Sequence, residues 1–157
     1  MRNGLCGLFW IMRRLVLSAV LLVMIAAGAA SADMKIIVAI AGKNFYATLE
    51  ENPASRALYD HLPLTFKMRN IYGWQMACGL PYTLPTGRLS ANNYKVGDII
   101  YWPPRHNLAI LYKQNGQRFQ RQHLGHIDAG AEEFASMGDV EVTFAPYEEP
   151  EEQIKTE

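Results

Sequence analysis

The segment MKIIVAIAGKNFYATLEENPASRALYDHLPLTFKM, from Met34 to Met68, holds the pattern that decides the fold of this 157-residue chain. Its first stretch is strongly β-branched and is interrupted at Gly42-Lys43. A glycine between two such runs is a typical turn signal. We therefore expect a β-hairpin whose strands span residues 34–41 and 44–49.

The second half of this segment predicts a short helix followed by another strand. Asn52 is a good N-cap, and Pro53 fits the first helical position, where its missing N–H is not needed. The helix is expected to run for about ten residues and to end before Pro63, because the residue that precedes a proline disfavours helical geometry. Over residues 64–70 apolar and polar side chains alternate, which is typical of a half-buried strand.

The rest of the chain contains short runs of strand residues separated by turns. Residues 71–86 mix aromatic residues with glycine and proline, and residues 87–95 form a polar loop. Asn115-Gly116 is the strongest short-range hairpin signal in the chain. About seven strands at this spacing favour a mainly β domain, a closed antiparallel barrel, with a β-sandwich as the alternative. The later strands are predicted over 99–102, 107–113, 118–127 and 140–145, with a helical turn over 131–137.

The first 32 residues have the pattern of a secretory signal peptide. An apolar run over 15–25 follows Arg13-Arg14 and precedes a stretch of small residues that ends at Ala30-Ser31-Ala32. Basic start, short apolar run and small-residue cleavage site are the three parts of such a signal. We expect an exported protein, periplasmic or extracellular, with no stable membrane anchor after cleavage. An uncleaved anchor and a start at Met12 are the alternatives.

The distribution of charge argues against a nucleic-acid partner. The first 32 residues contain three arginines and no acid, which leaves 12 basic and 15 acidic residues, a net charge of −3, on the rest. A nucleic-acid-binding surface needs an excess of basic residues to displace counterions from phosphates. Residues 148–157 contain five glutamates and are interpreted as a flexible acidic tail, so that residues 33–147 form the folded domain.

The mature chain shows no recognisable metal or cofactor motif. Cys78 is its single cysteine and has no flanking base, so a buried, unreactive thiol is expected. His123 and His126 are three residues apart, which on a regular strand places them on opposite faces and predicts no metal site. No phosphate-binding glycine loop and no nucleophile motif is present, and no cofactor is expected.

Several stretches together carry a family resemblance. They are the segment 34–68 with its Asn52-Pro53 and Leu62-Pro63-Leu64, GDIIYWPP over 97–104, NLAILYK over 107–113 and LGHID over 124–128. In these the chain resembles the cyclophilin-like fold proteins of bacteria and archaea, small domains related in shape to the peptidyl-prolyl isomerases. The resemblance implies an eight-stranded barrel with helices that close its ends. Members of this group mostly lack an established activity, so it implies the fold more firmly than the function.

Aromatic residues suggest where a ligand binds. They lie beside glycine and proline in two stretches, 66–82 and 101–106, that a barrel can bring together. A concave, aromatic-lined cleft with a few polar groups is the usual form of a peptide or small-molecule site, although packing in the core is the alternative for the same side chains. The candidate ligand-binding residues are Phe66, Tyr72, Trp74, Gln75, Tyr82, Tyr101, Trp102 and Arg105.

Two hypotheses of function follow. The first is an exported module that binds a peptide or small molecule without altering it. The second is a weak prolyl isomerase. Cyclophilins carry an Arg, a Phe and a Gln around their proline pocket, and the resemblance places Phe66, Arg69 and Gln75 in these roles. Arg69 is then the candidate catalytic residue. Arg69 alternates with Phe66 and Met68 on its strand, so it faces out of the barrel if they face in. A cleft at Arg69 then requires loops that cover the outside of the barrel.

Overall fold

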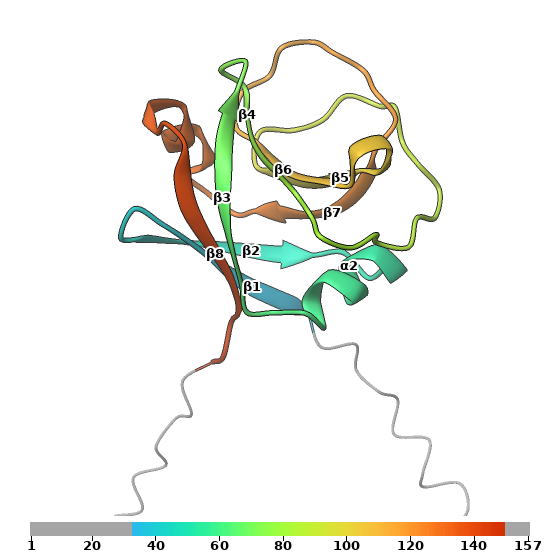
Figure 1. Ribbon diagram of the computed structural model, residues 1–157, viewed down its shortest axis with the longest axis horizontal. Helices are drawn as coiled ribbons and strands as arrows, with labels where there is room; N and C mark the ends of the chain where they lie inside the picture. Colours follow the sequence, from blue (N-terminus) through green and yellow to red (C-terminus); the bar gives the residue numbers. More distant parts are fainter. Residues whose placement is uncertain (1–32, 150–157) are drawn as a thin grey trace, which may run out of the picture. The chain divides into compact units, whose positions relative to one another are not determined.

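The structure, a computed structural model, describes residues 33–149, in which eight antiparallel strands form a closed barrel (Figure 1). The predicted signal peptide and most of the predicted acidic tail lie outside the described residues. The strands follow the order β1-β2-β7-β5-β6-β4-β3-β8 around the barrel, which confirms the closed antiparallel barrel and excludes the sandwich. The elements are β1 (Met34–Ile40), β2 (Lys43–Leu49), α2 (Pro53–Tyr59), β3 (Leu64–Ile71), β4 (Gln75–Gly79), β5 (Asp98–Trp102), η2 (Pro103–Arg105), β6 (Asn107–Leu111), β7 (Gln122–Ile127), η3 (Ala131–Ser136) and β8 (Val140–Pro146).

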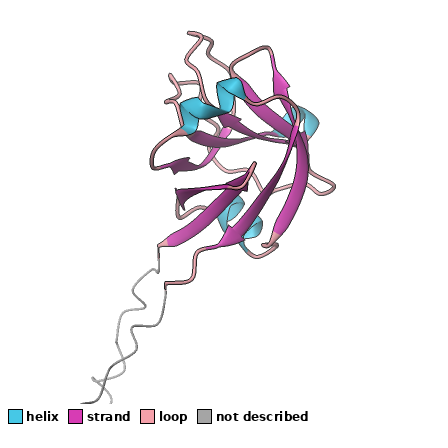
Figure 2. Ribbon diagram, turned by 90° about the vertical axis from the view of Figure 1, so that its left-hand side faces the viewer, coloured by secondary structure: helices cyan, strands magenta, loops and turns pink. Residues whose placement is uncertain are grey.

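The helix α2 closes one end of the barrel, at the bottom in Figures 1 and 2. Asn52 caps it as predicted, because its side-chain oxygen accepts from the backbone N–H of Ser55 at 2.9 Å. The helix is fixed to β7, since the Ser55 hydroxyl donates to the carbonyl of Leu124 at 2.8 Å. Ala54 and Leu58 are fully buried in the barrel core, so the capping sequence and the apolar face of α2 act together to seal this end.

The barrel has two apolar layers, one inside and one outside. The inner layer takes alternate residues of every strand except β7, including Met68 on β3 and Val142 and Phe144 on β8, as the alternation in the sequence predicts. The strands β5 and β6 are buried on both faces, because Ile100, Ala109 and Leu111 belong to a second cluster outside the barrel. Trp74, Ala77 and Tyr94 complete this outer cluster, and the partly buried Phe119 packs on it.

The hairpin predicted at Asn115-Gly116 is wrong. β6 lies between β4 and β5, whereas β7 lies between β2 and β5, so the two strands that flank this turn are not neighbours. Residues 112–121 instead form a loop over the outside of the barrel, and the strand predicted over 118–127 starts only at Gln122. Tyr94 holds the loop: its hydroxyl donates to the side-chain oxygen of Asn115 at 2.8 Å and accepts from the backbone N–H of Asn115 at 2.9 Å. The loop is therefore held by its contacts with Tyr94 and not by the hairpin pairing that the turn signal predicts.

Cys78 is half-buried on β4 rather than fully buried, with its side chain packed against the inner core. Burial raises the pKa of its thiol to about 12, so it is protonated at neutral pH. An unreactive thiol, as the sequence predicts, is consistent with this environment. None of the helices in residues 33–149 is long and apolar enough to cross a bilayer.

Candidate functional site

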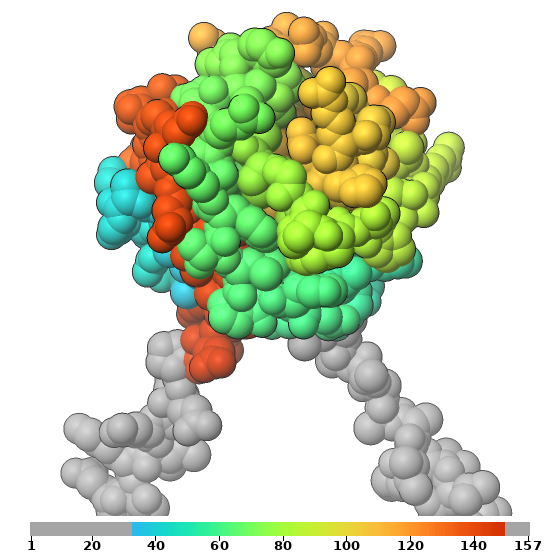
Figure 3. All heavy atoms as spheres, in the orientation of Figure 1, coloured from blue at the N-terminus to red at the C-terminus, as the bar shows by residue number. Residues whose placement is uncertain are grey.

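A cleft lies on the outside of the barrel, over β3, β4, β5 and β6, and we call it the outer cleft. Its volume is about 610 Å³, which is within the range of small-ligand sites. In the space-filling view the β3–β4 hairpin, η2 and the 112–121 loop surround a hollow on the face turned to the reader (Figure 3). The cleft brings together six residues that the sequence analysis named, namely Arg69, Tyr72, Trp74, Gln75, Trp102 and Arg105.

The floor of the outer cleft is flat and apolar because small residues face outward from the middle strands. Ala77 on β4 pairs with Ala109 on β6, and Ile100 on β5 is the next residue across. Two methyl side chains on adjacent strands leave room above the sheet that larger residues would fill. Trp74 and Phe119 form one wall and pack edge to face, with ring centroids 6.0 Å apart. The 112–121 loop, which carries Phe119, therefore supplies the cover that an outward-facing Arg69 requires.

Polar groups surround this apolar floor. Arg69 projects from the outer face of β3, where it pairs with Ala77, and it forms no ion pair with any carboxylate in the part of the chain that the structure describes. Arg105, which ends η2, lies over the ring of Trp102 with its guanidinium carbon 6.0 Å from the ring centroid. Tyr72 occupies the β3–β4 turn with φ +54° and is 88% exposed. No carboxylate, imidazole or thiol is among the residues that line the cleft, so this arrangement offers binding groups but no general acid–base pair.

Three of the predicted ligand-binding residues do not line the outer cleft. Phe66 shares the inward face of β3 with Met68, as the alternation requires, and packs on the inner core. Tyr101 alternates with Ile100 on β5 and is fully buried inside the barrel. Tyr82 stacks on His61, with ring centroids 4.3 Å apart, beyond the end of β4. The prediction assigned aromatic residues from the whole of two stretches to one cleft. In a pleated strand, however, successive side chains point to opposite faces, so some of these residues lie inside the barrel and others outside.

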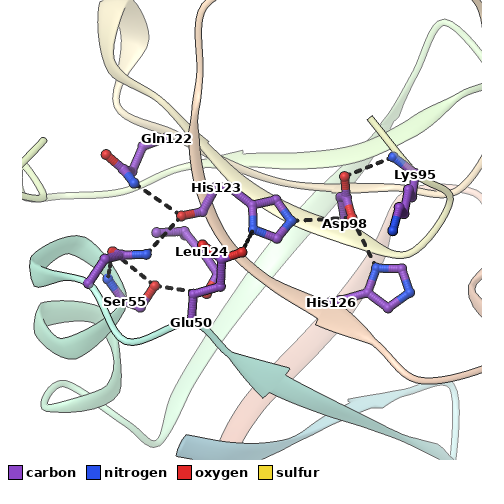
Figure 4. A network of polar contacts seen from close by, with 9 residues as sticks. Glu50, Ser55, Lys95, Asp98, Gln122, His123, Leu124 and His126 are labelled. Carbon is purple, nitrogen blue, oxygen red and sulfur yellow. Dashed lines mark hydrogen bonds and ion pairs between the residues drawn. The ribbon is translucent and has the colours of Figure 1, made fainter. Parts of the chain in front are cut away.

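A second polar site lies on the other side of β5, at residues for which the sequence predicted no site. His123 and His126 on β7 both contact Asp98 on β5: His123 Nε2 is 3.2 Å and His126 Nδ1 is 3.0 Å from the same carboxylate oxygen (Figure 4). The prediction that the two histidines face opposite ways is wrong because of a β-bulge. Ile99 pairs with Gly125 but Ile100 pairs with His123, so one extra residue on β7 interrupts the alternation.

The charges around Asp98 determine how this second site ionises. Burial alone raises the pKa of Asp98, but hydrogen bonds from His123, from the backbone N–H of Lys95 and from His126 outweigh it and hold the pKa at about 2. Burial lowers the pKa of His123, yet Asp98 and Glu50 together raise it above its ordinary value. Glu50 approaches His123 Nδ1 to 2.8 Å, so a second carboxylate stabilises the protonated form of this imidazole. The cluster is thus a carboxylate held between two imidazoles.

Gly97 permits this arrangement. It has φ +98°, and a Cβ atom there would lie 3.0 Å from His126 Cε1 and 2.9 Å from the carbonyl oxygen of Ile127. Only glycine combines this backbone conformation with room for the histidine ring. Across residues 33–149, no group of three or more histidine, cysteine, aspartate or glutamate side chains has the geometry to hold a metal ion.

Comparisons with known proteins agree with the architecture. A family model described as the cyclophilin-like family matches residues 38–145 of this chain. The solution structure of a hypothetical protein from Archaeoglobus fulgidus is similar, with a TM-score of 0.61 and 16% sequence identity, over 76% of this chain and 99% of that one. At this identity the likeness shows the fold alone. No curated protein matches the chain.

Proposed function

The chain belongs to the cyclophilin-like family, and from this premise we propose that it is an exported domain that binds a peptide or small ligand in the outer cleft. The observation that carries the proposal is the outer cleft itself, which combines an apolar floor with aromatic walls and uncommitted polar groups. A soluble domain rarely leaves such a surface open unless something binds there.

The chemistry of the cleft favours a short extended peptide that contains proline. A proline ring is compact and apolar, so it fits over the floor of Ala77 and Ala109 between the aromatic walls. The peptide carbonyls beside the ring are acceptors, and Arg69, Gln75 and Arg105 are donors on the rim. Tyr72 is placed to cover a bound peptide, because its side chain is exposed at the tip of the β3–β4 turn.

We expect Tyr72→Ala and Trp102→Ala each to weaken binding of a succinyl-Ala-Ala-Pro-Phe peptide by about tenfold, or about 1.4 kcal/mol, which is typical of an aromatic residue central to an interface. Intrinsic tryptophan fluorescence, or isothermal titration calorimetry for Trp102→Ala, measures the affinity. Tyr46→Ala is the matched control, since Tyr46 and Tyr72 are the exposed large apolar residues of the described part and Tyr46 lies on β2, away from the cleft. Equal losses in Tyr72→Ala and Tyr46→Ala would contradict the proposal.

The second candidate function is prolyl isomerisation, and it rests on Arg69. Rotation about a prolyl bond is slow because resonance makes the C–N bond partly double. Twisting this bond localises the lone pair on nitrogen, so a guanidinium aimed at that nitrogen stabilises the transition state more than the ground state. This requires no proton transfer and no nucleophile, which suits a cleft that has neither acid nor base. Arg69 is on the outer face of β3 and lines the cleft, which is the position that the mechanism needs.

If the protein is an isomerase, Arg69→Ala lowers its kcat/KM by at least about tenfold in a protease-coupled prolyl-peptide assay. Lys67→Ala is the control, because Lys67 is exposed on the same face of β3 and does not line the cleft. Peptide binding without acceleration over the uncatalysed rate leaves the binding module as the function and eliminates the isomerase. Acceleration that survives Arg69→Ala assigns the catalysis to another group.

Export is part of the proposal and has its own test. The support is the order of basic residues, apolar run and Ala30-Ser31-Ala32 before Asp33. Expression in a host with a secretory pathway is expected to give a periplasmic or extracellular protein whose intact mass corresponds to a chain that starts at Asp33. An intact mass that retains residues 1–32 would rule out cleavage at this position.

A further inference from the structure

A polar cavity of about 580 Å³ separates β7 from the loop that precedes β5, and it is distinct from the outer cleft. The loop is joined to the residue that precedes β7, because Ser90 and Arg121 exchange two backbone hydrogen bonds, of 2.9 and 3.0 Å. Glu50 and Asp98 supply two carboxylates to the lining. Arg88, Lys95 and Arg121 supply three permanent cations, so the permanent charges of the cavity sum to +1 before either histidine is protonated.

The two carboxylates of this cavity are already occupied. Asp98 contacts both histidines with one oxygen and accepts from the backbone N–H of Lys95 with the other, at 2.8 Å. Glu50 contacts His123. Neither carboxylate forms an ion pair with Arg88, Lys95 or Arg121, and no other carboxylate among residues 33–149 does so. Three cations therefore line one cavity without a direct ion pair, although Asp98 attracts Arg121 from a greater distance: burial lowers the pKa of Arg121, and this attraction raises it.

Arg121 is the most buried of these cations. The residue is only 3% exposed, its Nε is buried without a hydrogen-bond partner, and one terminal nitrogen donates to the carbonyl of Phe119 at 3.2 Å. The guanidinium carbon lies over the rings of Tyr94 and Phe119, at 5.7 and 5.3 Å from their centroids, and these contacts hold the group in place. A buried guanidinium normally has an anionic partner, because an unpaired buried charge is costly. Its partnerless Nε and its other terminal nitrogen, which does not donate to Phe119, suit an anion that binds two guanidinium nitrogens at once.

We propose that the polar cavity binds the carboxylate or phosphate group of a small anionic ligand, with Arg121 as the inner donor and Arg88 and Lys95 at the mouth. The two mouth residues are exposed on the loop that covers β7, so they can approach an anion that Arg121 already holds. The Asp98–histidine cluster forms the opposite wall, and its imidazoles offer further donors when they are protonated.

The test is a titration of the purified protein with inorganic phosphate and, separately, with malonate, at constant ionic strength and pH 6. Thermal unfolding reports binding, since a ligand that binds only the folded state raises Tm. Saturable stabilisation by at least one anion is expected, and the tighter of the two identifies the class of ligand. The double variant Arg88→Gln/Lys95→Gln is expected to weaken the binding at least tenfold without disturbing the fold, because both side chains are exposed.

The matched control is Lys67→Gln/Lys113→Gln, which removes the same charge from exposed positions outside the cavity. Binding that is weakened equally by this control would overturn the proposal, because the effect would then belong to net charge. Absence of saturable stabilisation by either anion would also overturn it. Arg121→Lys, which keeps the charge but loses the planar pair of donors, supports the proposal if it folds and binds at least tenfold more weakly. None of these outcomes depends on whether the outer cleft binds a peptide.

Discussion

Gly125→Ala is expected to destabilise the barrel by about 3 kcal/mol, at the upper end of what overpacking a core costs. A Cβ atom at this position would lie 2.4 Å from the carbonyl oxygen of Thr48 and 2.8 Å from the Cα of Leu49. Both are backbone atoms of β2, so a side-chain rotation cannot relieve the clash. The contact between β2 and β7 is short, with only three residue pairs, and it closes the barrel. The substitution forces these two strands apart.

Urea unfolding followed by tryptophan fluorescence measures this loss as a lower midpoint. Gly79→Ala is the matched control, because Gly79 also lies in a strand but a Cβ there meets nothing closer than Asn107 Oδ1, at 3.9 Å. We expect its free energy of unfolding to stay within about 0.5 kcal/mol of that of the wild type. Equal stability of Gly125→Ala and Gly79→Ala would mean that β2 and β7 are not as close as the structure shows.

Asp98→Asn is expected to lower the free energy of unfolding by about 2–3 kcal/mol near pH 5.5, because it removes charged hydrogen bonds to a buried carboxylate. The Asp98 side chain is only 8% exposed and accepts from two histidines and one backbone N–H. Asparagine has the same shape, but its amide cannot neutralise His123. Asp128→Asn is the control, because it removes the same charge from an exposed residue that follows β7 directly.

The same substitution changes how stability depends on pH. The pKa of Asp98 is lowered from 3.8 to about 2, so the stability it contributes is present above pH 3.8 and is lost as the pH falls toward 2. The pKa of His123 is raised above 6.5, so its contribution is present below pH 6.5 and is lost as the pH rises through its folded value. The cluster should therefore contribute most to the free energy of unfolding of the wild-type protein between about pH 4 and 6.5. The difference in stability between wild type and Asp98→Asn, measured at pH 3, 5.5 and 8, is expected to be largest at pH 5.5. A difference that does not change with pH would exclude this account of the cluster.

The strands near the N-terminus could be predicted from sequence because their signals are local. The Gly42-Lys43 turn, the Asn52 cap and the alternation after Pro63 each depend on neighbouring residues, and the barrel uses all of them as expected. The Asn115-Gly116 turn failed as a hairpin signal because pairing is decided by the whole barrel, in which β6 and β7 are separated by β5.

The candidate site was predicted in part, and the reason lies in the pleat of the strands. Arg69 was placed correctly on the outside because it alternates regularly with Phe66 and Met68 on β3. Tyr101 was assigned to the ligand although it faces the core, because IIYW is apolar on both faces and gives no alternation. Uninterrupted apolar runs such as IIYW in β5 and LAIL in β6 are typical of strands buried on both faces. They are the sequence signals that indicate an outer apolar layer.

The convergence of His123 and His126 on Asp98 had no reliable signal in the sequence. It depends on one extra residue in β7, opposite β5, and a bulge of this kind leaves no consistent mark on the pattern of apolar residues. The closest indication of this site in the sequence is a pair of glycines. Gly97 precedes Asp98 and Gly125 precedes His126, and at both positions neighbouring atoms leave no room for a side chain. A glycine within a strand pattern is a known indication of a bulge or a close contact.

The central claim is that the outer cleft binds the ligand, and amide chemical-shift mapping tests it most directly. A ¹⁵N-labelled sample is titrated with the succinyl-Ala-Ala-Pro-Phe peptide, and the amides that shift are placed on the structure. The account predicts saturable changes over residues 69–77, 100–109 and 117–119, which line the cleft or lie directly beneath it. Changes confined to the opposite side of β5, around Asp98 and His126, or no saturable change at all, would contradict it.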